Sequence, residues 1–224
     1  MTIRSKLYAA IVVVVAALSL TVGVGVWGAG RLSDRFDDVQ RAADARALAL
    51  QLKFDVTDFN GWQTAYGYDN GRSRPIYLAS FARSQRDMNR ARAELVHAHE
   101  VLLLDRIGAA TDAFARYDKM AWSALRAGRD REVRRILLGP EIENFQQAAT
   151  AAQALAEVED ARASAHERAF RNARTDALRL LVGASIIAAF LVIILLVTAL
   201  DLARSAERTL EKDEDTDTAP TAES

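Results

Sequence analysis

Two long stretches of the chain contain no charged residue, at positions 7–30 and 180–200. A helix needs about 20 apolar residues to cross the hydrocarbon core of a membrane, so each stretch predicts a membrane-spanning helix. The first could instead be a cleaved signal peptide, because Arg4 and Lys6 precede it and small residues follow Trp27. Its apolar run is longer than the roughly 7 to 15 residues typical of a signal peptide, which favours an uncleaved anchor.

Between these stretches, apolar residues recur at spacings of three and four, which is typical of amphipathic helices. Four such stripes follow one another, at residues 48–66, 77–102, 103–124 and 142–173. Turn-forming residues punctuate them, at Asp69-Asn70-Gly71, Pro75, Gly128 and Gly139-Pro140. These residues predict where helices end or begin.

The predicted fold is therefore all-α, with two transmembrane helices flanking an up-down-up-down four-helix bundle. The predicted order is an inner N-terminus (1–6), the first span (7–30), an extracytoplasmic bundle (31–179), the second span (180–200) and a short acidic disordered cytoplasmic tail (201–224). Nothing marks a break at Gly30-Arg31 or at Arg179-Leu180, so the first and fourth helices are predicted to continue into the spans. Basic residues outside the spans, Arg4 and Lys6 among them, favour cytoplasmic termini, whereas arginines bordering a long loop carry little weight.

Composition narrows the chemistry. The 224 residues include no Cys and 3 His, and the net charge is -1. The absence of Cys excludes disulfide scaffolds and thiol enzymes. The net charge near zero argues against a nucleic-acid partner. His97 and His99 stand two positions apart and so point to different sides of a helix, which disfavours a metal site. We expect no catalytic residues, no cofactor and no enzyme activity.

The chain resembles the four-helix-bundle sensor module of methyl-accepting chemotaxis receptors and related bacterial membrane sensors. The matching segments are 124–132, with sequence ALRAGRDRE, 136–139, with sequence ILLG, and 55–66, with sequence DVTDFNGWQTAY. The resemblance implies an extracytoplasmic sensor, usually dimeric, that binds a small solute or a binding protein. Those receptors continue into a long cytoplasmic signalling hairpin, so with only residues 201–224 after the second span we expect a separate effector.

Aromatic and amide side chains gather at the end of the predicted bundle farthest from the spans. Members of this layer are Trp62, Gln63, Tyr66, Trp122 and Phe145. An aromatic-walled space with a few polar groups suits a small solute, although aromatics at helical spacing are more often core packing.

Two carboxylates make this layer a candidate ligand site. Asp55 interrupts the first apolar stripe one turn before Phe59, and Asp58 lies beside it. A carboxylate in an apolar layer is costly unless it is paired. Lys53, an arginine of a neighbouring helix or a cationic ligand could pair with Asp55, and the sequence leaves these three open.

Small residues repeat every fourth position in the first span, at Ala17, Thr21, Gly25 and Ala29. This spacing lets two backbones approach closely in lipid and predicts a homodimer face, or alternatively the packing of the two spans of one chain. The leading functional hypothesis is a two-pass cell-membrane sensor that signals to a separate effector. The alternative is a non-sensing membrane assembly or docking protein that uses the bundle as a protein-interaction surface.

Overall fold

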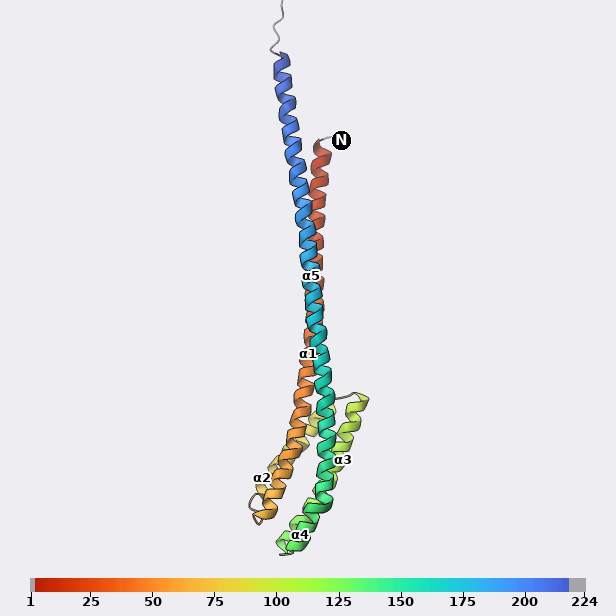
Figure 1. Cartoon of the computed structure of the whole chain (residues 1–224), viewed down its shortest axis with the longest axis vertical. Coiled ribbons are helices and arrows are strands. Elements are labelled where there is room, and N and C mark those ends of the chain that lie inside the picture. Colours follow the sequence, from red (N-terminus) through yellow and green to blue (C-terminus); the bar gives the residue numbers. More distant parts are fainter. Residues whose placement is uncertain (1–2, 218–224) are drawn as a thin grey trace, which may run out of the picture. The chain divides into compact units, whose positions relative to one another are not determined.

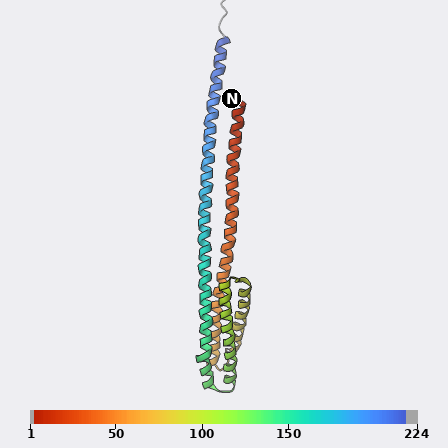
Figure 2. The same ribbon diagram turned by 90° about the vertical axis from the view of Figure 1, so that its right-hand side faces the viewer.

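The computed structural model describes residues 3–217, and its regular elements are all helical over this range, which confirms the all-α prediction. The elements are α1 (Ile3–Tyr68), α2 (Arg74–Glu94), α3 (Ala98–Arg126), α4 (Asp130–Ile136), the π-helical segment η1 (Leu137–Glu141) and α5 (Ile142–Asp217) (Figure 1). Figure 2 shows the same helices after a quarter turn. Residues 1–2 and 218–224, the ends of the predicted inner N-terminus and tail, lie outside the described residues.

Most of the predicted helix boundaries are confirmed. The helix α1 is unbroken at 30–31, and α5 is unbroken at 179–180. After α1 the chain turns through Asn70 and Gly71, whose φ angles of 56° and 87° lie in the left-handed region, and Gly128 after α3 has a φ of 69°. The left-handed region is open to glycine without steric cost, which is why these turns stop the helices.

The boundary between the second and third helices was predicted wrongly. The apolar stripes place it between residues 102 and 103, whereas α2 ends at Glu94 and α3 begins at Ala98. The physical reason is a capping box: His97 is the N-cap of α3, and the Glu100 side chain accepts a hydrogen bond from the His97 backbone N–H at 3.0 Å. Leu102 consequently belongs to α3 and is exposed.

The approach to α5 contains an additional short helix. The sequence predicts only that Gly139-Pro140 starts or kinks the fourth helix. In the structure these two residues lie inside η1, which directly follows α4. Gly139 has non-helical angles, with φ -115° and ψ -111°, and Pro140 cannot donate a backbone hydrogen bond. The kink is therefore confirmed, and α4 is an element that the apolar stripes did not indicate.

The C-terminal segment differs from the predicted disordered tail. The helix α5 continues to Asp217 instead of ending near residue 200. Residues 201–212 are rich in Leu, Ala, Arg, Glu and Lys, which all have high intrinsic helix propensity. The acidic character of the segment was therefore a poor guide to its backbone conformation.

The chain divides into two compact units, and the first comprises residues 1–34 and 171–224. Its parts of α1 and α5 contain windows of mean hydropathy 2.6 and 3.1, so both helices are long and apolar enough to cross a membrane. Within this unit Ala17 is buried, Thr21 and Gly25 are half-buried and Ala29 is exposed. Three of the four residues of the predicted dimer face are thus at least partly covered within one chain, as the alternative interpretation of this spacing expects.

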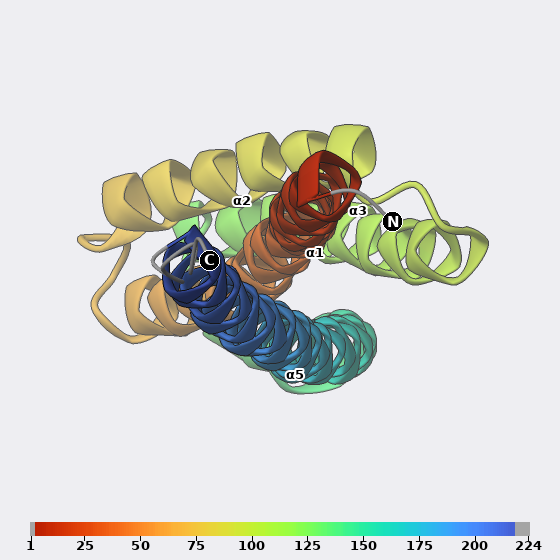
Figure 3. The same cartoon turned by 90° about the horizontal axis from the view of Figure 1, so that it is seen from above.

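The second unit, residues 35–170, is organised around one hydrophobic core to which α1, α2, α3 and α5 all contribute. Phe59 of α1 lies at its centre with no exposed surface, and its ring centroid is 5.1 Å from that of Phe114 and 5.4 Å from that of Phe81. Alanines from α5, such as Ala152, complete the core and allow the helices to approach closely. Figure 3 shows these helices from above. We call this unit the helical bundle.

Candidate functional site

The two predicted carboxylates of α1 are both paired with one arginine of α2. Arg83 donates through Nε to Asp55 at 3.2 Å and through Nη2 to Asp58 at 2.6 Å. Asp58 also accepts hydrogen bonds from Ser80 and, at 3.2 Å, from the Trp62 indole N–H. An arginine of a neighbouring helix, one of the three options left open by the sequence, is thus the partner of Asp55.

Burial still dominates the electrostatics of Asp55, which has no exposed surface. Desolvation and the nearby Asp87 raise its pKa to about 6, against the opposing effect of hydrogen bonds from Gln51 and Arg83. One carboxylate oxygen, Oδ2, has no hydrogen-bond partner. Lys53 is exposed and forms no ion pair with Asp55. The pairing of Asp55 and Asp58 is internal, so these two residues stabilise the contact between α1 and α2.

A second cluster lies at the loop end of the bundle, where an arginine is enclosed by aromatic rings. The Arg74 guanidinium carbon is 4.7 Å from the ring centroids of Tyr66 and Trp122 and 5.2 Å from that of Tyr77. Arg74 also forms two parallel hydrogen bonds with the buried Asp118, at 2.8 and 2.9 Å, and Asp118 accepts a third from the Tyr66 hydroxyl. We call the four residues around this guanidinium, Tyr66, Tyr77, Trp122 and Asp118, the Arg74 cage. The Arg74 side chain occupies the centre of the cage.

Glu141 of η1 is the unpaired acid beside this cage. It is 1% exposed, and neither carboxylate oxygen has a hydrogen-bond partner in the described part of the chain. Burial first, and then the negative charge of Asp118, raise the pKa of Glu141 to about 8, although Arg74 opposes the rise. Glu141 is therefore mostly protonated at neutral pH.

A cavity of about 330 Å³ opens between the end of α1 and the segment formed by α4 and η1. We call it the α1–α4 cavity. Asn60 and Gln63 contribute amides from α1, Asp130 and Arg134 contribute charges from α4, and Leu125, Val133, Leu137, Leu138 and Ile142 form an apolar wall. Gln63 is 2% exposed, and its amide nitrogen has no hydrogen-bond partner among the described residues. An unpaired buried amide costs about 1–3 kcal/mol, so a ligand that accepts a hydrogen bond from this nitrogen would remove that cost.

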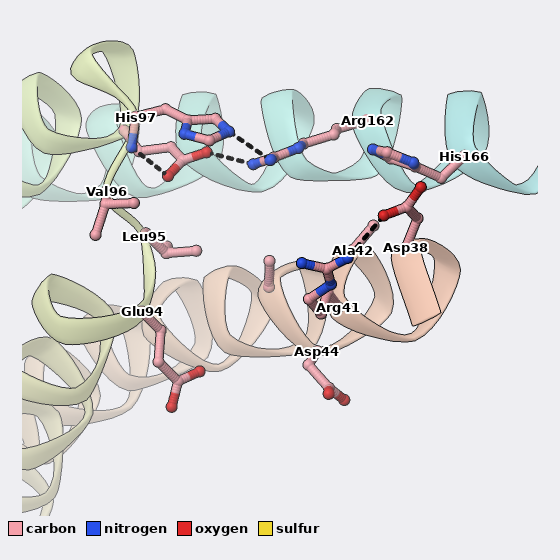
Figure 4. Close-up of a pocket in the computed structure, with 12 residues that line it drawn as sticks. Asp38, Arg41, Ala42, Asp44, Glu94, Leu95, Val96, His97, Arg162 and His166 are labelled. Atoms are coloured by element: carbon pink, nitrogen blue, oxygen red, sulfur yellow. Dashed lines mark hydrogen bonds and ion pairs between the residues drawn. The ribbon is translucent and has the colours of Figure 1, made fainter. Parts of the chain in front are cut away.

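A second cavity, of about 380 Å³, lies beside the turn between α2 and α3 and is bordered by α1 and α5. Figure 4 shows Arg162 reaching along α5 toward His97, and Arg41 directed at Asp38. Arg162 Nη1 donates to the buried Glu100 at 2.7 Å. The printed pairs of this cavity, Arg41 with Asp38 and Arg162 with Glu100, join lining residues to one another, so these four charges are satisfied without a ligand.

Glu159 of α5 lies 3.9 Å from Arg162 and has no exposed surface, and within residues 3–217 neither of its carboxylate oxygens has a hydrogen-bond partner. Burial and the neighbouring Glu100 raise the pKa of Glu159 to about 7, while Arg162 opposes the rise. Two buried carboxyls thus lie beside one guanidinium, and Glu159 is about half protonated at pH 7.

The predicted ligand layer therefore divides into separate environments. Asp55, Asp58 and Trp62 belong to the Arg83 network, Tyr66 and Trp122 to the Arg74 cage, Gln63 to the α1–α4 cavity, and Phe145 packs against the core. The partners Arg74, Arg83, Asp118 and Glu141 were missed. Asp118 carried a usable signal, because it stands four positions after Phe114 on an apolar stripe, as Asp55 stands four positions before Phe59.

Comparison of the chain with protein-family models, with curated proteins and with solved structures finds no match. The class of protein that the fold and the cavities define is an all-helical one, with two helices able to cross a membrane and a helical bundle that carries charged and amide-lined cavities.

Proposed function

We propose that this protein is a membrane-anchored sensor that binds a small solute in the α1–α4 cavity and passes a signal across the membrane. In this proposal both termini are cytoplasmic, and residues 31–179 form an extracytoplasmic up-down-up-down bundle. The signal travels along α1 and α5 to a separate effector. The carrying observation is Gln63, a buried side chain with an unpaired amide nitrogen in the wall of a cavity large enough for a small molecule.

Two further features support a sensing role. The cavity is bordered by η1, whose Gly139 departs from helical geometry, so a ligand would contact a distorted segment that leads into α5. Leu137 of η1 also packs on Gly67, where an added Cβ would lie 2.7 Å from the leucine Cδ1. Movement of η1 on α1 is thus a direct way for an occupied cavity to shift one long helix against the other.

The experiment is a solute screen on the full chain in detergent micelles, with thermal unfolding as the signal. A ligand that binds only the folded protein raises the free energy of unfolding, by about 2.7 kcal/mol at a concentration 100 times its Kd, and so raises the melting temperature. We expect at least one small solute to stabilise the wild type and to lose its effect in Gln63→Leu. Gln40→Leu, an exposed glutamine of α1 outside the cavity, is the matched control. Hits that stabilise Gln63→Leu equally would place binding elsewhere and refute the assignment.

A docking role is the second candidate, because Leu50 and Phe54 of α1 are 45% and 57% exposed and stand four positions apart on one face. Failure of the whole solute screen, together with loss of a protein complex in a Leu50→Ser, Phe54→Ser variant, would favour this role over sensing.

A further inference from the structure

The cavity between α1 and α4 has two chemically distinct sides. Its apolar wall comes from α3, α4, η1 and α5, and includes the buried Val133 and the half-buried Leu137. Its polar groups come from α1, where Asn60 and Gln63 stand one helical turn apart, and from α4, which contributes Asp130 and Arg134. A solute that fills this space therefore needs an apolar body with a polar group at one end.

Hydrogen-bond donors on two helices line the cavity, Gln63 on α1 and Arg134 on α4. Among the described residues the Gln63 amide nitrogen is a donor without a partner, and Gln63 lines the cavity. Among the residues that the structure describes, Arg134 forms no ion pair, although it lies on the cavity wall. The polar end of the solute is thus expected to carry acceptors.

Charge then selects among acceptor groups. Asp130 stands one turn before Arg134 on α4 and also borders the cavity, so it opposes an anion. Arg134 and Gln63 outnumber it as partners for a carboxylate, whose two oxygens accept hydrogen bonds from both a guanidinium and an amide. An ammonium group would find one acidic partner and would face the unpaired amide donor.

We infer that the α1–α4 cavity binds a small monocarboxylate with an apolar body, its carboxylate placed between Arg134 and Gln63 and its body against Val133 and Leu137. This inference rests on the proposed function, because it names the ligand class of the same cavity. Arg134 is exposed, so it can be replaced without loss of core packing.

The test compares three probes of the same size, hexanoate, hexanamide and hexylamine, by calorimetric titration of the full chain in detergent micelles. We expect hexanoate to bind tightest. Arg134→Gln should lower the affinity for hexanoate by about threefold to tenfold, the range for a partly exposed charge-assisted contact. Asp130→Asn should raise the affinity for hexanoate. Neither change should affect hexanamide. Arg131→Gln, an exposed arginine of the same helix that does not line the cavity, is the matched control and should leave hexanoate unchanged.

The opposite signs of the two variants make the outcomes distinct. Preference for hexylamine, with weaker binding in Asp130→Asn, would overturn the carboxylate assignment and leave solute sensing in place. Equal affinities of all three probes, or an Arg134→Gln variant indistinguishable from Arg131→Gln, would overturn it as well. If none of the probes binds but another solute from the screen depends on Gln63, the ligand class is wrong and the proposed function stands. If no solute of any kind binds, the proposed function itself fails.

Discussion

Replacing Glu159 by glutamine should stabilise the helical bundle near neutral pH. Glu159 has no exposed surface, its two oxygens have no hydrogen-bond partner, and its closest cation, Arg162, is 3.9 Å away and engaged with Glu100. Ionisation of Glu159 therefore places a second negative charge beside a guanidinium that already has a partner. Glutamine keeps the size of the side chain and cannot ionise.

The size and sign of the effect follow from proton linkage. Burial raises the pKa of Glu159 from 4.5 in the unfolded chain to about 7 in the folded protein. Between these values the unfolded state has lost the proton and the folded state has kept it, so the free energy of unfolding falls as the pH rises. One pKa unit corresponds to about 1.4 kcal/mol, which gives a loss of about 3 kcal/mol that is complete above pH 7 and absent below pH 4.5.

The assay is urea unfolding of the full chain in detergent micelles, followed by circular dichroism at pH 4 and pH 8. At pH 8 we expect the free energy of unfolding of Glu159→Gln to exceed that of the wild type by about 3 kcal/mol, which corresponds to about 10 °C in melting temperature. At pH 4 we expect the two proteins to be equally stable. The control is Glu157→Gln, an exposed glutamate of the same helix. A Glu159→Gln variant less stable than wild type at pH 8 would show that Arg162 stabilises the ionised carboxylate by more than burial destabilises it.

Two further predictions concern backbone packing. A double Gly28→Cys, Ala177→Cys variant should form an intramolecular disulfide on oxidation. The reason is that a Cβ at Gly28 would lie 3.6 Å from the Cβ of Ala177, within the range of about 3.5–4.5 Å that disulfides require. We expect a faster-migrating monomer on a non-reducing gel, and a disulfide-linked dimer would refute the intrachain packing. Gly71→Ala should lower the free energy of unfolding by about 2–4 kcal/mol, because Gly71 has a positive φ and an added Cβ would lie 2.7 Å from the Trp122 ring. Gly128 also has a positive φ but has open space around it, so Gly128→Ala should lower the free energy of unfolding by only about 1 kcal/mol. Urea unfolding of both variants distinguishes them, and equal losses would contradict the contact with Trp122.

The sequence by itself determined the helical class and most helix ends, because both depend on local properties. The uncharged stretches at 7–30 and 180–200 and the recurrence of apolar residues at three and four are visible along one dimension. The turn at Asn70 and Gly71 was likewise readable, since a left-handed backbone angle favours particular residue types. The α2–α3 boundary was misplaced because the apolar stripe continues through the break, and only the capping box at His97 stops the helix.

The burial of Asp55 was also readable from its place on an apolar stripe, and the structure confirms it. Its partner was not readable, because Arg83 lies 28 positions away and many arginines of this chain have a suitable charge. The same holds for Arg74 and Asp118, which are 44 positions apart, and for Glu141 beside them. Helical periodicity states which residues face inward on one helix. It contains no information on the rotation and height at which another helix packs against them, so the partners of buried charges and the walls of the cavities were decided by tertiary structure alone.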